Sequence, residues 1–356
     1  MAIVERGWNA ALMRPLARIP GWAWFVFGLL LAVAATVWLQ RQSEAASLGF
    51  VFVCTFATVP PPRFPDALFT VVVEPIPMYL LGAAAFWYVR AFRWARERGY
   101  GRQFPRWRLA AFLGGTALVL LSVFGPAAAY DHTFLSVHMV QHFLLITLAP
   151  PLLLMGAPMT LFLLRLGRDR RHRLAYPLLH SRPFRAFTHP LVGLGLFALV
   201  PTLWYVTPAF DASLDHQALH YGGYALFLFA GVHYWWPIVP GNPTRWNLAY
   251  PLQIAYLLAL VPIHAFLGLM FYQPDNVLYE QLATIPRSWG PSPLLDQQFA
   301  GAFMFVVGEA LGLAALMVVA VRWAAAEEAK GRRYDRETAR RRGASPSAAQ
   351  GRGNQG

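Results

Sequence analysis

The sequence predicts an all-α fold, a polytopic membrane helix bundle of about eight spans with both termini in the cytoplasm. Of its 356 residues, 57% are hydrophobic and 13% are charged, whereas a soluble domain is usually about 25% charged. Several apolar runs also reach the roughly 20 residues needed to cross a hydrocarbon core of about 30 Å. Clusters of positive charge between alternate runs give each crossing its direction.

The apolar runs divide the chain into four parts. A cytoplasmic lead (1–20) precedes an extra helix with an outer, Pro-rich segment (21–66), a seven-span bundle (67–323) and a basic tail (324–356), which is helical at first and then disordered. The expected spans are 21–40, 67–90, 108–129, 134–164, 189–207, 214–239, 249–272 and 298–323. A shorter run, 46–58, is expected to be interfacial or re-entrant, or part of a ninth crossing.

The fourth expected span, 134–164, is unusually long. A straight helix of this length would measure about 46 Å at 1.5 Å per residue. Pro150-Pro151 and Gly156-Ala157-Pro158 predict a kink or a break within it.

The net charge of +13 follows the topology. On an eight-span alternation, 27 of the 30 basic residues fall on one side, and only Arg41, Arg63 and Arg287 fall on the other. Because basic loops stay in the cytoplasm, the charge indicates orientation and contact with anionic lipid, and it argues against nucleic acid as a partner.

Cysteine and signal patterns exclude several classes of protein. Cys54 is the single cysteine, so an intrachain disulfide and a paired-cysteine copper or redox motif are both excluded. The segment Ala45-Ala46-Ser47 could serve as a cleavage site after the first apolar run. The long segment that precedes this run (1–20) and the length of its apolar core favour an uncleaved membrane anchor instead.

The most informative motif is His138-Met139-Val140-Gln141-His142, which lies inside an apolar run. Residues four apart lie about 40° apart around a helix, so both imidazoles share one face. His216 and His220 repeat this spacing at the outer end of 214–239. Imidazole pairs suit copper or zinc. The four histidines therefore predict a shared ligand, redox or metal site near the outer leaflet.

Other polar residues have two open interpretations. His264 and His233 are either packing residues or ligands, and His132 is expected to be solvated at the outer mouth. Asp131, Asp215 and Asp296 are outer carboxylates that could orient imidazoles. Glu74 is expected inside a span, where it serves either a cation or proton step or a hydrogen bond at a kink. Glu309, in mid-span, is expected to face the bundle interior.

Three stretches resemble the multi-span CtaG family of cytochrome c oxidase assembly factors over roughly 67–323. They are the His138–His142 motif with LAPPLLLMGAP at 148–158, His220 with FAGVHYWWP at 229–237, and DQQFAGAFM at 296–304. The resemblance implies a role for His138, His142, His220, Asp296 and Gln297. Members often carry a second histidine where this chain has Tyr224, and we expect His216 to compensate.

The resemblance implies a non-enzymatic protein of the bacterial inner membrane that matures heme–copper cytochrome c oxidase. Copper is then the expected cofactor, held by His138, His142, His220 and His216, with Gln141, Tyr224, Asp296, Gln297 and His264 in support. Oxidase subunits, the lipid bilayer and a copper donor protein are the expected partners. Because ligation needs neutral imidazoles, binding is expected to weaken below about pH 6.5.

Three alternatives remain open from the sequence. A membrane cytochrome would use the histidines to hold heme, although pairs on one helix argue mildly against it. A transporter for copper or another cation would line its path with Glu74 and Glu309. A scaffold would dock oxidase subunits without binding a metal of its own.

Overall fold

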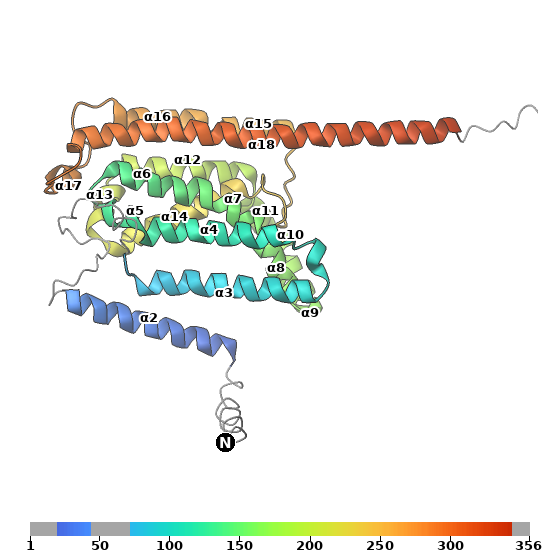
Figure 1. Cartoon of the computed structure of the whole chain (residues 1–356), viewed down its shortest axis with the longest axis horizontal. Helices are drawn as coiled ribbons and strands as arrows, with labels where there is room; N and C mark the ends of the chain where they lie inside the picture. Colours follow the sequence, from blue (N-terminus) through green and yellow to red (C-terminus); the bar gives the residue numbers. More distant parts are fainter. Residues whose placement is uncertain (1–19, 44–71, 344–356) are drawn as a thin grey trace, which may run out of the picture.

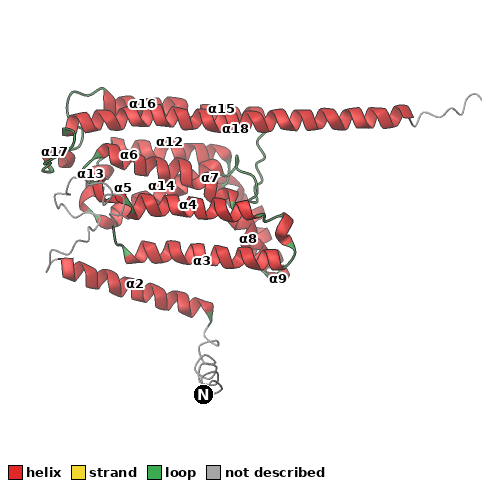
Figure 2. Cartoon of the chain, in the orientation of Figure 1, coloured by secondary structure: helices red, strands yellow, loops and turns green. Residues whose placement is uncertain are grey.

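The computed structural model describes residues 20–43 and 72–343. In this part of the chain every regular element is a helix, apart from a single bridge residue, Val72, whose N–H donates to the carbonyl oxygen of Phe124 (Figure 2). The predicted all-α class is confirmed. The short apolar run 46–58, Cys54 and the end of the basic tail lie outside the described residues.

The bundle combines long helices with several broken ones (Figure 1). The continuous long helices are α2 (Gly21–Ser43), α3 (Pro75–Glu97), α12 (Pro190–Val206), α14 (Gln217–Trp235) and α18 (Pro293–Gly343). The broken ones are α4 (Arg106–Phe124) with α5 (Pro126–Tyr130), α6 (Leu135–Phe143) with α7 (Ala149–Met155), and α15 (Tyr250–Leu258) with α16 (Val261–Tyr272). Short helices connect them: η2 (Tyr100–Arg102), α8 (Pro158–Arg165), α9 (Arg168–Arg170), η4 (Arg171–Ala175), α10 (Tyr176–His180), α11 (Arg182–Phe187), α13 (Ala209–Asp215) and α17 (Glu280–Thr284).

Length and composition identify five described helices that could cross a membrane, or six if the bent pair α12–α13 forms one span. The five are Gly21–Leu39, Arg106–Tyr130, Leu135–Met155, Tyr250–Tyr272 and Pro293–Ala339. Each contains or overlaps an expected span. Helices α3 and α14 also form where spans are expected, but they fall outside this set. Eight crossings and cytoplasmic termini therefore stay predictions.

The long span predicted over 134–164 does break. A π-helical turn, η3 (Leu144–Leu148), separates α6 from α7, and it lies directly before Pro150-Pro151. Proline lacks an N–H and clashes with the carbonyl four residues earlier, which explains the wider turn. The second break comes at Ala157, whose positive φ of 52° ends α7 and redirects the chain into α8. Tyr88 steadies this corner by donating to the carbonyl oxygen of Gly156 at 2.7 Å.

Helix α14 packs closely against the π turn because Gly231 has no side chain. A Cβ at this position would overlap the carbonyl oxygen of Ile146 and lie 2.6 Å from Pro150 Cγ. The carbonyl of Ile146 is also the one that Pro150 displaces from the helix ladder. This contact fixes α14, which carries His220, against the helix that carries His138 and His142.

The arginine-rich segments gather at one end of the bundle. The end of α3 and the short helices α9, α10 and α11 lie there, whereas α5, α13 and α17 lie at the opposite end (Figure 1). This separation agrees with a basic cytoplasmic end. By the same rule, the end with α5, α13 and α17 is predicted to be the outer one.

Two helices extend away from the main bundle (Figure 1). Helix α2 lies beside α3, where Tyr79 donates to the carbonyl oxygen of Phe25 at 2.8 Å. Helix α18 continues well past the bundle and carries the first part of the basic tail, which we expected to be helical.

Glu74 is the N-cap residue of α3, the helix that covers most of the expected span 67–90. Its side chain is buried, and Gln217 of α14 donates to its Oε1 at 2.6 Å.

Candidate metal centre

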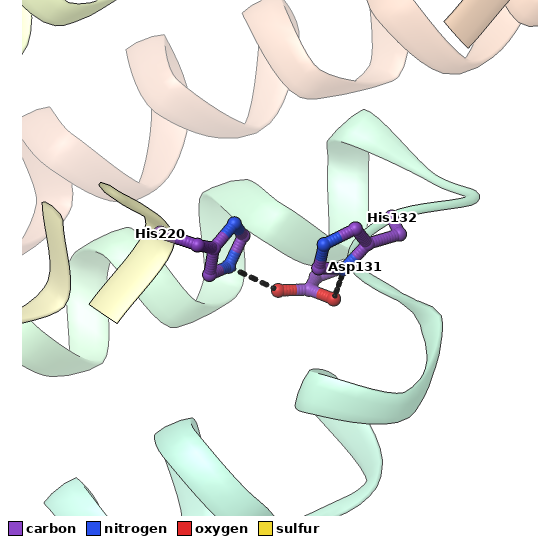
Figure 3. A group of neighbouring side chains, drawn as sticks. All are labelled: Asp131, His132 and His220. Atoms are coloured by element: carbon purple, nitrogen blue, oxygen red, sulfur yellow. Dashed lines mark hydrogen bonds and ion pairs between the residues drawn. The ribbon is translucent and has the colours of Figure 1, made fainter. Parts of the chain in front are cut away.

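The polar centre of the outer end is Asp131, which follows the short helix α5. Its carboxylate is fully buried and lies between two imidazoles (Figure 3). His132 Nδ1 lies 2.7 Å from Oδ1, and His220 Nε2 from α14 lies 3.2 Å from Oδ2. One carboxylate thus joins the α5–α6 connection to α14.

The same three residues can present ligand atoms to one ion. One nitrogen or oxygen from each of Asp131, His132 and His220 lies within 4.8 Å of the other two. The two imidazole rings stack with centroids 4.5 Å apart and planes 25° apart. Imidazole nitrogen with one carboxylate oxygen is a donor set that copper and zinc accept.

His138 adds unpaired nitrogen atoms beside this cluster. Its side chain is 3% exposed, and neither ring nitrogen has a hydrogen-bond partner. Nδ1 lies 3.9 Å from Asp131 Oδ2, which is beyond hydrogen-bond reach. His220 Nδ1 is also buried without a partner. Buried polar groups usually have hydrogen-bond partners, so these ring nitrogens are available to coordinate a ligand.

The electrostatics keep Asp131 ionised. Burial alone would raise the pKa of Asp131, but the charge of His132 and the interactions with His132, His138 and His220 outweigh it. The pKa is held well below its usual range. The lowered pKa favours the carboxylate form of Asp131, which can accept a cation.

Tyr224 and Gln141 hold the cluster in place. Tyr224 donates its hydroxyl hydrogen to Asp131 Oδ2 at 2.7 Å. The Tyr224 hydroxyl oxygen also lies 2.6 Å from His220 Nε2. Gln141 Nε2 donates to this hydroxyl at 3.1 Å and to the carbonyl oxygen of Ser122 at 2.7 Å. Tyr224 thus occupies the centre of the network, in the position where a second histidine was expected from the family pattern.

His142 and His264 lie apart from Asp131. His142 is buried, and its Nδ1 lies 3.1 Å from the hydroxyl oxygen of Tyr205. His264 of α16 is buried, and its Nε2 has no hydrogen-bond partner. The structure therefore separates His142 from the carboxylate that His220 contacts.

His216 is not brought into the cluster. It is exposed, and its Nδ1 lies 3.1 Å from the carbonyl oxygen of Ala212, one turn earlier in the chain. His216 begins α14 with extended backbone, so the helical i, i+4 geometry assumed for His216 and His220 does not apply at this residue.

Asp296 and Gln297 support the site from α18. Asp296 accepts hydrogen bonds from the backbone N–H groups of Leu135 at 2.6 Å and Ser136 at 3.3 Å, which are the first two residues of α6. It also accepts from the Ser136 hydroxyl at 2.5 Å. Asp296 therefore caps the helix that carries His138.

Gln297 performs a similar structural role for a loop. Its Oε1 accepts from the Leu278 N–H at 2.8 Å, and its Nε2 donates to the carbonyl oxygens of Phe271 and Asn276. It ties the start of α18 to the end of α16 and the loop that follows. Its contacts are with backbone groups and not with the histidines.

Sequence reasoning missed His132 as a site residue and gave Asp131 only an orienting role. His132 was expected to be solvated, yet its side chain is only 12% exposed, because it packs against His220 and Asp131. Helical spacing offers no signal for this arrangement, because Asp131 and His132 lie in the turn between α5 and α6.

Comparison with known proteins gives one family and several relatives. The family model for the cytochrome c oxidase caa3 assembly factor (Caa3_CtaG) matches residues 86–326. Uncharacterized proteins of Mycobacterium bovis and Mycobacterium tuberculosis are each 32% identical over 272 residues, which is 72% of this chain. A Mycobacterium leprae protein is 28% identical over 268 residues. The chain spans only 40% of the length of these relatives. No solved structure matches it.

Proposed function

This chain belongs to the cytochrome c oxidase caa3 assembly factor family, and we propose that it carries copper for the oxidase at the outer side of the bacterial inner membrane. The observation that carries the proposal is the buried cluster of Asp131, His132 and His220, beside which His138 has two unpaired ring nitrogens. The family implies a role in oxidase assembly, and the cluster suggests that copper is what the protein carries.

Several features of the cluster favour copper. The donor set is mostly imidazole nitrogen, which suits copper and zinc, and heme–copper oxidases require copper for their own metal centres. The single carboxylate supplies one negative charge, so a monovalent copper ion would be neutralised by Asp131 alone. Calcium and magnesium are disfavoured, because both prefer shells made of oxygen ligands.

The residues have separate roles in this proposal. Asp131 offsets the cost of burying a cation. His132 and His220 exchange their hydrogen bonds to Asp131 for bonds to the metal, and His138 adds a nitrogen that has no hydrogen bond to give up. Tyr224 keeps its contacts with Asp131 and His220 and so orients both ligands.

Release requires exchange of ligands with an oxidase subunit. His132 and His220 can return to their hydrogen bonds with Asp131 when the ion leaves, so the exchange needs no covalent step. A non-catalytic role fits this picture, because the proposed cluster binds and transfers an ion and leaves no bond changed in a substrate.

The test uses cells in which the gene for this protein is replaced by variants. We expect Asp131→Asn/His138→Ala to reduce cytochrome c oxidation by isolated membranes and to lower the copper content of the purified oxidase. The matched control is His233→Ala, another buried histidine of α14, which lies among Phe187 and Phe229. Normal oxidase copper in the Asp131/His138 variant would overturn the proposal and favour a metal-free scaffold.

A further inference from the structure

A cavity of about 470 Å³ lies between α3 and α14. Its walls also include residues of α2, α4 and the π turn η3, and α2 and α3 lie side by side in Figure 1. Leu80 of α3 lines the cavity and is 44% exposed, and Ala225 of α14 lines it and is exposed as well. The cavity therefore opens on the outside of the bundle, where a membrane protein meets lipid.

Polar groups of this cavity gather at the end that is predicted to be the outer one. Glu74 caps α3, and Gln217 is the first residue of α14. Gln217 Nε2 donates to Glu74 Oε1 at 2.6 Å, and Glu74 is only 3% exposed. Tyr221 follows Gln217 by one helical turn and lines the same cavity. A carboxylate, an amide and a phenol therefore line one end of it.

The cavity continues inward as an apolar path. Most of its remaining described wall is aliphatic. A second cavity of about 610 Å³ shares Leu81, Val119 and Leu228 with the first and extends to Trp236. From Gln217 to Trp236 the chain of α14 rises about 28 Å at 1.5 Å per residue, which is close to the thickness of a hydrocarbon core. The two cavities together can hold a long apolar chain.

The chemistry of the walls defines the class of ligand. Sites for small molecules are typically apolar cavities of roughly 300–1,000 Å³ in which a few polar groups fix the orientation. A hydroxyl-bearing head can donate to Glu74 and accept from Tyr221. A phosphate head would place a negative charge beside the carboxylate of Glu74, and a bare cation would be costly to bury among aliphatic walls. The cavity therefore favours a neutral head that carries hydroxyl groups.

Tyr224 connects this cavity to the candidate metal centre. It lines the cavity, and its hydroxyl donates to Asp131 Oδ2 at 2.7 Å and lies 2.6 Å from His220 Nε2. An occupant of the cavity would therefore contact the residue that orients two of the proposed copper ligands.

We propose that the two cavities bind a neutral, long-chain lipid whose head carries hydroxyl groups. The head lies at Glu74 and Gln217, and the chain runs along α14 toward Trp236. A quinol and a diacylglycerol both have this chemistry. The inference goes beyond the proposed function, because the cavity can bind such a lipid whether or not copper is present.

The experiment measures lipid binding to copper-free, detergent-purified protein by native mass spectrometry under argon. The probes are decylhydroquinone, dioctanoylglycerol and dioctanoylphosphatidylglycerol, of which the last keeps hydroxyl groups but adds a phosphate. We expect at least one neutral probe to bind about 10-fold more tightly than the phospholipid, or better. The tighter of the two neutral probes then identifies the lipid as a quinol or a diacylglycerol.

Two variants locate the binding. Glu74→Gln removes the charge of the carboxylate and should reduce the preference for the neutral probe by about 10-fold. Ala225→Phe fills the first cavity and should weaken binding of the neutral probe by a similar factor. Leu226→Phe is the matched control, because Leu226 is 38% exposed on the same helix and lines neither cavity. Size-exclusion profiles and thermal unfolding confirm that each variant is folded.

The contrary outcomes are equally specific. Equal affinity for the three probes, or no binding of any of them, would overturn the proposal. An unchanged preference in Glu74→Gln or an unchanged affinity in Ala225→Phe would also overturn it, because the lipid would then lie elsewhere. Since copper is absent throughout, these outcomes do not bear on the proposed function.

Discussion

At the scale of single residues, Tyr224 determines the geometry of the cluster. Its hydroxyl contacts Asp131, His220 and Gln141, which come from the α5–α6 connection, α14 and α6. Substitution of a residue that orients metal ligands in this way typically lowers metal affinity 10- to 100-fold. Tyr224 is therefore the most informative position for a conservative substitution.

We predict that Tyr224→Phe weakens copper binding by roughly 10- to 100-fold and lowers stability by about 1–3 kcal/mol, since Asp131 and Gln141 each lose a buried partner. Chelator competition and thermal unfolding measure the two effects. Tyr256→Phe is the control, because Tyr256 is also buried but donates to the carbonyl oxygen of Tyr234 at 3.2 Å, outside the cluster. Equal copper affinity in both variants would remove Tyr224 from the site.

Tyr224→His gives a complementary prediction. This substitution restores the histidine that members of the family often carry at this position. We expect the variant to bind copper at least as tightly as the parent, because the lost hydroxyl is replaced by a nitrogen ligand. A loss as large as that of Tyr224→Phe would mean that the hydroxyl, and not a ligand at this position, is needed.

The individual histidines could be predicted from the sequence, but their partners could not. Spacing alone placed His138 and His142 on one helix face, and both are buried there. The burial of His132 depends on how the α5–α6 connection folds over α14, which spacing does not encode. The prediction that His216 shares a helix face with His220 is wrong for a local reason, since the extended backbone of His216 places it outside the helix.

At the scale of helices, α6 depends on a cap from a distant part of the chain. Its first two N–H groups are satisfied by Asp296 of α18. We predict that Asp296→Ala costs about 1–2 kcal/mol of stability, as the loss of a capping side chain usually does. It should also weaken copper binding, because the end of the helix that carries His138 frays.

Asp296→Asn is the matched variant, since an amide oxygen can still accept one of these hydrogen bonds. It should retain more stability and more copper affinity than Asp296→Ala in the same unfolding and competition assays. If the two variants behave alike, the effect comes from the lost charge opposite Arg287, which lies 3.7 Å from Asp296, and not from capping.

The contact between α14 and the π turn gives a second prediction at this scale. Gly231→Ala places a methyl group against Ile146 and Pro150 and should lower stability by about 1–3 kcal/mol through overpacking. Gly222→Ala on the same helix is the control, because nothing lies within 4 Å of the added Cβ. Thermal unfolding of the two purified variants should differ, and equal stability would refute the close packing.

Helix positions were more predictable than their internal structure. The apolar runs marked most helices, and Gly156-Ala157-Pro158 marked the end of α7 correctly. The π turn at Leu144–Leu148 was not predicted, because the proline pair indicates a kink but not how the preceding turn adapts. The start of α3 was also placed too early, because apolar residues continue ahead of Pro75, where the helix begins.

At the scale of the whole molecule, the distribution of charge predicts orientation. The arginine-rich ends of α3 and α9–α11 should face the cytoplasm. In a Cys54→Ser background, Asp275→Cys should react with a membrane-impermeant maleimide applied from outside, and Arg182→Cys should not. Both residues are exposed. The reverse labelling pattern would invert the topology and place the cluster of Asp131, His132 and His220 on the cytoplasmic side.

The number of spans stays a prediction, since length and hydropathy identify five or six candidate spans among the described helices where eight crossings are expected. Hydropathy counts apolar residues but does not distinguish a helix that faces lipid from one enclosed by its neighbours. Helix α14 illustrates this, since it packs against α12 and carries buried polar groups such as His220 and Tyr224. Such a helix scores as less apolar although it belongs to the core of the bundle.

The most direct test of the central claim is the copper affinity of the purified protein beside an Asp131→Asn/His132→Ala/His220→Ala variant. The parent should bind Cu(I) tightly, and the variant should lose the copper held by Asp131, His132 and His220 while remaining folded. Equal copper binding by the two proteins, or no copper in the parent, would contradict the account.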